Sequence, residues 1–479
     1  MINQLYTVNK NNMLKIFNTL GRKKEEFRPL KKKQVSFYQC GPTVYWTQHI
    51  GNMRAMVIAD LIRRSLEYLG YKVTFARNYT DVGHLTSDED EGEDKIEIAA
   101  RRDKLSPRAA ADKYIAVFEQ DVKDLNCLEP KFKPRATQYI PQMKKMVQQL
   151  LDKGFAYSTD LAIYFDVSKA KNYTQLSGQD LSKNISEKGK AEVSDPRKKN
   201  PADFALWFFK AGVHKNALQY WPSDFSSPLA KNGEGFPGWH LECSAMNKAL
   251  FGPALDLHLG GVEHIPVHHT NEIAQSEAAS GVKFVNYWIH NEHLNVDNGK
   301  MAKSQGTAYS LQEIKDRGFD PLVLRYFFLQ AHYRSKQNFT WEALISAQSA
   351  LAGWREKILA DKQQKKGKIN RDFKDKFLAA LRDDFNLPQA LAIAWNLLKS
   401  DLAGGDKLAT ILDFDRVLGL NLDQIKAEKI PKKILALAES RQIARREKNW
   451  SESDRLRDEI GRLGYKVLDA KDGYQILPR

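Results

Sequence analysis

The chain of 479 residues has little cysteine, and it lacks long apolar runs. Its three cysteines, Cys40, Cys127 and Cys243, are too far apart for the disulfide framework of a small secreted protein, so we expect core residues, ligands or reactive thiols. No uncharged stretch approaches the roughly 20 apolar residues of a membrane-spanning helix. The N-terminal segment also lacks the apolar core and cleavage site of a signal peptide. These absences predict a cytoplasmic location and no membrane partner.

Length and charge narrow the possibilities further. The chain exceeds what one hydrophobic core usually serves, so about two to four domains are expected at roughly 100–200 residues each. It holds 74 Lys and Arg against 59 Asp and Glu, a formal net charge of +15. Basic clusters gain free energy by releasing counterions from phosphate backbones, which favours a nucleic acid as partner. The charge alone is equally compatible with a merely basic protein.

A β-α-β unit is predicted near the N-terminus. Residues 35–39 indicate a short strand, residues 53–70 an amphipathic helix, and residues 71–82 a second strand. The run His-Ile-Gly-Asn, from His49 to Asn52, lies where the first strand turns into the helix. Exposed N–H groups and the helix dipole attract phosphate there. The run is therefore a nucleotide site or, as is commoner, an ordinary helix cap.

A helical pattern covers residues 107–125. From about 134 to 210 the pattern shifts to a helix over 136–153, a strand over 161–167 and a polar segment from 169 to 200, which indicates an insertion with a mobile segment. The acidic block at residues 87–94 is typical of a solvated loop, with a metal-binding loop as the lesser alternative. We leave Cys127 as a buried apolar residue.

Two candidate metal ligands share one predicted helix. A turn at residues 235–238 precedes a helix over 240–250 that carries Cys243, and a core strand follows over 254–261. In the next helical segment His268 and Glu272 are four residues apart, so they lie on one face, as two metal ligands would. An ordinary surface pair on a helix has the same spacing.

A second chemical signal is the segment NGKMAKSQGT, residues 298–307. Lys300 and Lys303 lie between two glycines, so the loop can bring positive charge onto a polyphosphate. An isolated Lys-x-x-Lys is usually a solvated loop. Here the early His-Ile-Gly-Asn run accompanies it.

These two runs resemble the His-Ile-Gly-His and Lys-Met-Ser-Lys-Ser signatures of class I aminoacyl-tRNA synthetases. Over nearly the whole chain, ordered motifs are similar to those of the cysteinyl-tRNA synthetase family. They are CGPTVY, PRAT, DFALW, GWHLECSAMN, HHTNEIAQSEA, HYRS, DDFNLPQAL, FDRVLGL and KNWSESDRLRDEI.

The resemblance implies an α/β fold: a Rossmann-type parallel-sheet catalytic domain with an inserted domain, then an α-helical bundle and a small C-terminal α+β domain. It implies a monomer that activates L-cysteine with ATP and Mg²⁺ and transfers it to the 3′ end of tRNA for cysteine. The expected divisions are the two catalytic halves at 1–133 and 215–297, the insertion at 134–214, the lysine-loop segment at 298–342, the helical bundle at 343–430 and the C-terminal domain at 431–479.

The resemblance also implies the site residues. Cys40, Cys243, His268 and Glu272 would bind one Zn²⁺ that selects the substrate thiol; two thiolates, an imidazole and a carboxylate are an acceptable zinc set. The nucleotide and catalytic residues would be His49, Asn52, Lys300 and Lys303, with Lys303 on the phosphates. The cysteine pocket would comprise Gly41, Thr80 and Trp239, although Trp239 is also a candidate core aromatic. Near the C-terminus a charged helix and a short strand are expected, with tRNA contacts from Arg445, Arg446, Lys448 and Trp450, or with a merely solvated helix face.

The chain departs from the family pattern at four places. Asn52 replaces the second histidine but can still donate a hydrogen bond to phosphate. Ala302 replaces a serine and leaves both loop charges in place. Glu263 stands at a position that is commonly Asp, and the acidic block interrupts what is often Thr-Asp-x-Asp-Asp-Lys after Thr80.

The same motifs are compatible with two other functions. One is a ligase that passes activated cysteine to an amine on a small molecule, but such relatives lack the full C-terminal region that this chain has. The other is a catalytically silent RNA- or zinc-binding protein. The intact lysines and zinc set argue against it.

Overall fold

The chain divides into two units, residues Met1–Asp423 and Gln424–Arg479, and each is described by itself. The computed structural model describes residues 13–85, 92–180, 195–301, 306–365, 367–426, 431–470 and 473–478. Most of the acidic block, part of the polar segment after 169, and Lys303 lie outside the described residues.

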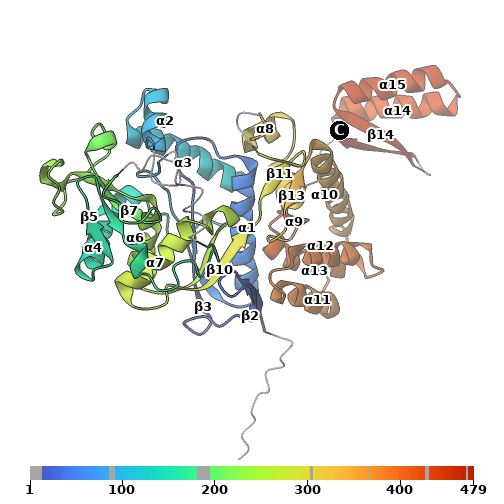
Figure 1. The fold of residues 1–479 in the computed structure, drawn as a ribbon. Helices are drawn as coiled ribbons and strands as arrows, with labels where there is room; N and C mark the ends of the chain where they lie inside the picture. The colour runs from blue at the N-terminus through green and yellow to red at the C-terminus, as the bar shows by residue number, and fades with distance from the viewer. Residues whose placement is uncertain are drawn as a thin grey trace, which may run out of the picture. The chain divides into compact units, whose positions relative to one another are not determined.

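The centre of the first unit is a parallel sheet with strand order β10-β9-β3-β4 (Figure 1). Helix α1 (Ile50–Tyr68) joins β3 (Gln34–Gln39) to its neighbour β4 (Lys72–Arg77), which confirms the predicted β-α-β unit. The other two strands are β9 (Leu255–Gly261) and β10 (Val285–Asn291). Every residue of β9 is buried, as expected of a strand covered on both faces.

Between β4 and β9 the chain builds a second sheet, antiparallel and ordered β5-β6-β7-β8. Its last strand, β8, comes after residue 214, the predicted end of the insertion. The sheet therefore includes residues on both sides of that predicted boundary. Helices α4, α6 and α7 pack against an apolar core with its strands. The elements are α2 (Lys95–Asp103), α3 (Pro107–Asp124), α4 (Ile140–Asp152), β5 (Ala156–Ser158), β6 (Ala162–Phe165), β7 (Phe204–Phe209), β8 (Gly235–Pro237), α6 (Trp239–Phe251) and α7 (His268–Ser280).

The rest of the first unit is a small sheet followed by helices. Strand β11 (Leu294–Val296) pairs antiparallel with β12 (Gly299–Lys300) and parallel with β13 (Gln337–Phe339). The aromatic rings of Phe377 and Phe414 stack 4.0 Å apart in the helical region. Its helices are α8 (Leu311–Asp316), α9 (Pro321–Leu329), α10 (Trp341–Asp361), α11 (Arg371–Arg382), α12 (Leu387–Lys399) and α13 (Gly404–Leu418), and a hairpin of β1 (Lys15–Asn18) and β2 (Lys23–Glu26) precedes β3.

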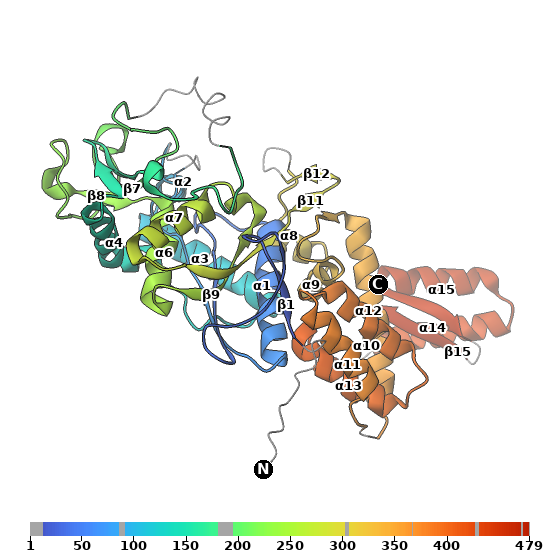
Figure 2. The same ribbon diagram turned by 60° about the horizontal axis from the view of Figure 1, so that its bottom comes forward.

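The second unit corrects the prediction of one charged helix and one strand. Helix α14 (Lys432–Arg446) ends before Lys448, whose φ of 61° is left-handed, and α15 (Trp450–Arg462) begins anew. The side chain of Asn449 caps α15 by accepting a hydrogen bond from the backbone N–H of Glu452. Strands β14 (Tyr465–Ala470) and β15 (Gly473–Pro478) form an antiparallel hairpin (Figure 2). These helices and strands have the α+β content predicted for this region.

No helix among the described residues of either unit has the length and apolar character needed to cross a membrane.

Candidate active site

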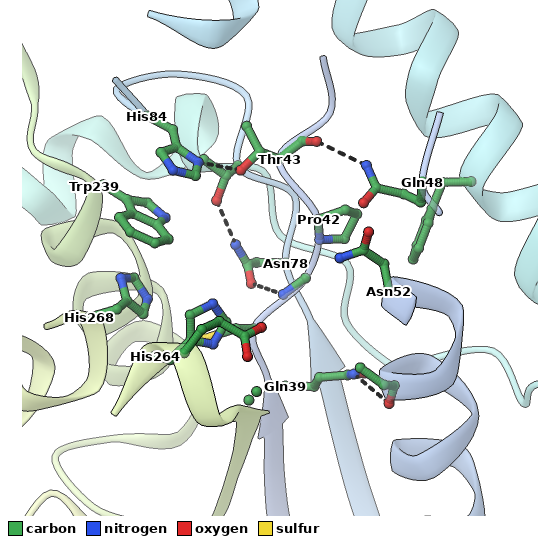
Figure 3. Close-up of a pocket in the computed structure, with 18 of the residues that line it drawn as sticks. Gln39, Pro42, Thr43, Gln48, Asn52, Asn78, His84, Trp239, His264 and His268 are labelled. Carbon is green, nitrogen blue, oxygen red and sulfur yellow. Dashed lines mark hydrogen bonds between the residues drawn. The ribbon is translucent and has the colours of Figure 1, made fainter. Parts of the chain in front are cut away.

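A cavity of about 330 Å³ opens at the carboxyl ends of the parallel strands (Figure 3). This is where open α/β sheets bind their ligands. Side chains from several elements reach it, including the loop after β3, the start of α1, the segment after β4 and the starts of α6 and α7. Eight predicted site residues line it: Cys40, Gly41, His49, Asn52, Thr80, Trp239, Cys243 and His268.

At the floor of the cavity the structure brings the four predicted metal ligands together. The Sγ atoms of Cys40 and Cys243 are 3.9 Å apart, although the two residues lie in different elements. Glu272 Oε1 lies 3.8 Å from Cys40 Sγ and 3.0 Å from His268 Nε2. The four ligand atoms all lie within 4.8 Å of one another, and all four residues are buried. The cluster can therefore hold one metal ion.

The charges within this cluster balance one another. Contact with the Cys40 thiol lowers the pKa of Cys243 to about 6, against the effect of burial. Burial alone would lower the pKa of His268, but its contacts with Cys243 and Glu272 raise it to about 10. Burial likewise opposes ionisation of Glu272, yet His258 and His268 lower its pKa to about 2. A thiolate, an imidazolium and a carboxylate thus stabilise one another at buried positions beside the cavity.

More histidines surround the cluster than the sequence analysis identified. His258 Nε2 lies 3.0 Å from Glu272 Oε2, and His269 Nε2 lies 3.3 Å from Cys40 Sγ. With Cys40 and Glu272 these two form a second group of suitable geometry. His258 lies in an apolar strand, and His269 directly follows a predicted ligand. No sequence pattern therefore identified either residue as a candidate ligand.

The opposite end of the cavity is the start of α1. His49 is the N-cap of this helix, and its Nδ1 accepts a hydrogen bond from the backbone N–H of Asn52 at 3.2 Å. A Cβ on Gly51 would come within 2.4 Å of Met301 Cε, so Met301 lies against the helix start. One residue of each signature run, 250 positions apart in the sequence, thus lies beside the other.

Between these ends lie the residues predicted to bind the amino acid. The N–H of Gly41 donates to Asn78 Oδ1 at 2.8 Å, and Asn78 Nδ2 donates to Thr80 Oγ1 at 3.3 Å. A Cβ on Gly41 would come within 1.7 Å of the Asn78 carbonyl oxygen, so only glycine fits. The Trp239 indole lies on the ring of His268, 4.2 Å between centroids. Asn78 was missed because an asparagine after a strand has no distinctive pattern.

The remaining predicted residues lie elsewhere. Lys300 ends β12. In the second unit, Arg445 lies over the ring of Trp450 at 5.5 Å, and Trp450 is 56% exposed. Cys127 is partly rather than fully buried, which corrects the expectation of a buried residue. Its Sγ lies 4.0 Å from Arg325 Nη1.

Comparison with solved structures shows the fold first. The fold is similar to the LeuRS of Agrobacterium radiobacter K84 in a ternary complex with tRNA (TM-score 0.60, 11% identity, 83% of this chain and 85% of that chain). It is also similar to the Mycobacterium tuberculosis methionyl-tRNA synthetase (TM-score 0.53, 14% identity, 81% and 90%). Residues 26–349 match the family described as tRNA synthetases class I (C) catalytic domain, so the chain is a class I aminoacyl-tRNA synthetase with the fold of these structures.

Sequence comparison then defines the family. Residues 427–476 match the cysteinyl-tRNA ligase anticodon binding domain. The chain is 41% identical over 471 residues to cysteine--tRNA ligase 1 of Burkholderia lata, covering 97% of this chain and 96% of the relative. It is 37% identical to the cysteine--tRNA ligase of Treponema denticola, covering 95% and 98%. The chain belongs to the cysteinyl-tRNA ligase family, as its motifs predicted.

Proposed function

We propose that this chain activates L-cysteine with ATP as cysteinyl-adenylate and transfers the cysteinyl group to the 3′ end of the tRNA for cysteine. The observation that carries the proposal is the composition of a single cavity. A cluster of two cysteines, a histidine and a glutamate forms its floor, and the capped start of α1 forms its opposite end. A thiol substrate and a nucleotide would therefore meet within it.

Zn²⁺ is the ion that fits the floor of the cavity, held by Cys40, Cys243, His268 and Glu272. Tetrahedral zinc with Zn–S bonds of about 2.3 Å requires sulfurs about 3.8 Å apart. The observed separation of the Cys40 and Cys243 sulfurs is 3.9 Å. When bound, the ion would supply a soft Lewis acid that favours the substrate thiolate over a serine hydroxyl.

The nucleotide would lie at the α1 end of the cavity. The helix dipole at the start of α1 and the side-chain amide of Asn52 suit a phosphate, and His49 fixes the geometry of this first turn. Lys300 and Lys303 would place positive charge on the phosphates as pyrophosphate leaves, with Mg²⁺ bound to the nucleotide.

Cysteine would lie between these two ends. Gly41 lines this part of the cavity, and Thr80 and Trp239 would form the walls beside the substrate side chain and amino group. Shape alone discriminates a thiol from a hydroxyl by only about 1–3 kcal/mol. Selection by metal coordination therefore makes a separate editing domain unnecessary.

The C-terminal regions would bind tRNA. We propose the helical bundle at 343–430 and the domain at 431–479 as the tRNA-binding parts, with Arg445, Arg446, Lys448 and Trp450 combining positive charge and stacking. The catalytic halves at 1–133 and 215–297 would flank the insertion at 134–214, with the lysine loop in 298–342. We propose a monomer that acts in the cytoplasm.

The test uses Cys243→Ser, with Cys127→Ser as a matched control because Cys127 lies outside the cavity. We expect Cys243→Ser to lose bound zinc and to lower cysteine-dependent ATP–pyrophosphate exchange by roughly 100-fold or more, since even residues that only orient ligands change activity about 10–100-fold. Zinc content is measured by elemental analysis, and ATP binding by calorimetry. Full exchange activity in a zinc-free Cys243→Ser variant would contradict the proposal.

A further inference from the structure

The segment after Thr80 departs from the family pattern, and it places His84 at the wall of the cavity. His84 follows β4, is only 8% exposed, and lines the same cavity as the predicted cysteine pocket. Its ring stacks on the indole of Trp239 with 4.0 Å between centroids and 9° between planes (Figure 3). The proposed substrate wall is thus backed by a second ring.

Hydrogen bonds on both nitrogens fix the orientation of His84. Nδ1 lies 2.5 Å from Thr43 Oγ1, and Nε2 lies 2.7 Å from Lys95 Nζ. A lysine ammonium has only donors, so Nε2 must accept. The ring proton then resides on Nδ1 and is donated to Thr43. His84 is held as one neutral tautomer in one ring plane.

The two hydrogen-bond partners of His84, Thr43 and Lys95, line the same cavity. Thr43 lies three positions after Cys40, in the loop that leaves β3. Lys95 begins α2, and its backbone N–H donates to the carbonyl oxygen of His84 at 3.0 Å. The clamp therefore joins His84 and Lys95, which flank the acidic block in the sequence.

Trp239 lies between two imidazole rings. His84 stacks on it at 4.0 Å, and His268, a proposed zinc ligand, contacts it at 4.2 Å. Parallel stacking over a large aromatic surface restricts tilting of the indole. The position of Trp239 relative to the floor of the pocket thus depends on His84.

We infer that His84 is a positioning residue for cysteine recognition: clamped by Thr43 and Lys95, it holds the Trp239 indole at the spacing from the metal cluster that fits a thiol side chain. This inference rests on the proposed cysteine pocket. It assigns a role in amino-acid binding to a segment in which the chain differs from the common family pattern. His84 acts through Trp239 and does not touch reacting atoms.

The experiment is a double-mutant cycle on the full-length, zinc-loaded protein with His84→Ala, Trp239→Ala and the double variant. Cysteine-dependent ATP–pyrophosphate exchange gives KM for cysteine, KM for ATP and kcat. We expect His84→Ala to raise KM for cysteine about 5- to 10-fold, the size of one aromatic stacking contact. KM for ATP and kcat should change less than about 2-fold, a split that general damage to the fold would not produce.

Two further variants separate stacking from hydrogen bonding. His84→Phe keeps a planar ring but loses both hydrogen bonds, whereas His84→Asn keeps a donor near Thr43 but loses the ring. We expect Phe to restore part of the affinity, because it keeps the stacking ring without the clamp, and Asn to restore little. His214→Ala is the matched control, because His214 contacts Phe208 and Phe236 outside this cavity, and it should leave every kinetic constant unchanged.

The outcomes distinguish this inference from the proposed function. If Trp239→Ala leaves KM for cysteine unchanged, the proposed pocket is wrong. If Trp239→Ala raises KM but His84→Ala does not, or if the two effects are fully additive, only the positioning role of His84 is wrong. Sub-additive effects in the double variant, with partial rescue by His84→Phe, support it.

Discussion

Helices α6 and α7 each have an apolar side, which packs in a core, and a polar side, which faces the cavity. Comparing the two sides distinguishes residues that stabilise the fold from residues that form the site. On one side Leu241, Met246 and Ala274 join the apolar core beneath the antiparallel sheet. On the other side Cys243 and His268 face the cavity. Both helices are buried almost all round, so neither shows the single apolar stripe of a surface helix.

Several polar side chains of these two helices pair with one another. His240 Nδ1 lies 3.0 Å from His268 Nδ1, and Gln275 Nε2 donates to Ser244 Oγ at 2.8 Å. A buried polar group without a partner costs about 1–3 kcal/mol. The apolar side stabilises the fold directly, whereas the pairs on the polar side avoid this cost and hold reactive groups in place.

The largest expected effect comes from the apolar side. Trp207 is fully buried in the middle of the antiparallel sheet, with its ring 5.7 Å from that of Phe225. Trp207→Ala should lower the free energy of unfolding by about 3–5 kcal/mol, the usual cost of a large core cavity. Denaturant unfolding checks the loss. Zinc content per folded molecule should stay unchanged.

The control for that change is Val213→Ala, because Val213 is 82% exposed. Its effect should stay within about 0.5 kcal/mol. If Trp207→Ala were no worse than Val213→Ala, the apolar side would not be the source of stability.

Local patterns predicted the elements but not the floor of the site. The β-α-β unit and the helices carrying Cys243 and His268 follow from periodicity and turn residues. Cys40 and Cys243 are 203 positions apart (243 − 40), and no spacing rule joins two such residues. The family resemblance named them. Their meeting depends on β3 pairing with β9, a contact between distant strands that local periodicity does not predict.

The same limit applies to residues without a motif. Only the contacts in the folded structure identify three of the site residues, namely His258, His269 and Asn78. The break between α14 and α15 was missed for a different reason. It depends on neighbouring residues, but only two of them mark it. Charged residues on both sides continue a helical composition, and only the left-handed Lys448 and the capping Asn449 interrupt it.

An intermediate effect is expected at Arg54, which tests whether paired polar groups stabilise the parallel-sheet side. Arg54 on α1 is 1% exposed, and burial lowers its pKa to about 10, so it stays charged. Its Nε donates to Gln337 Oε1 at 3.1 Å, and Nη2 donates to the carbonyl oxygen of Ser335 at 2.9 Å. Nη1 donates to the carbonyl oxygen of Glu292.

Arg54→Met should therefore lower the free energy of unfolding by about 2–3 kcal/mol, because buried carbonyl oxygens lose a charged donor. Hydrogen exchange should accelerate in residues 292–300, which carry β11 and β12. Arg54→Lys should recover part of the loss. An unchanged exchange rate in this segment would show that Arg54 does not anchor the small sheet.

The smallest expected effect is a pH dependence of the free energy of unfolding. It comes from His214, a titratable side chain that packs among the aromatic rings of the apolar side. Burial beside Phe208 and Phe236 lowers the pKa of His214 to about 4, from about 6.5 in an unfolded chain. Between these values the unfolded state binds more protons than the folded state, so stability present above pH 6.5 is lost as the pH falls toward 4. His214→Gln removes this titration and should lessen the loss by about 2 kcal/mol at pH 5, while at pH 7.5 the pH-linked difference should vanish. Hydrogen exchange of β7 and β8, compared between variant and parent at both pH values, isolates the local effect. An equal loss on acidification in both proteins would place the acid sensitivity elsewhere, and the apolar side would then be as insensitive to pH as its composition suggests.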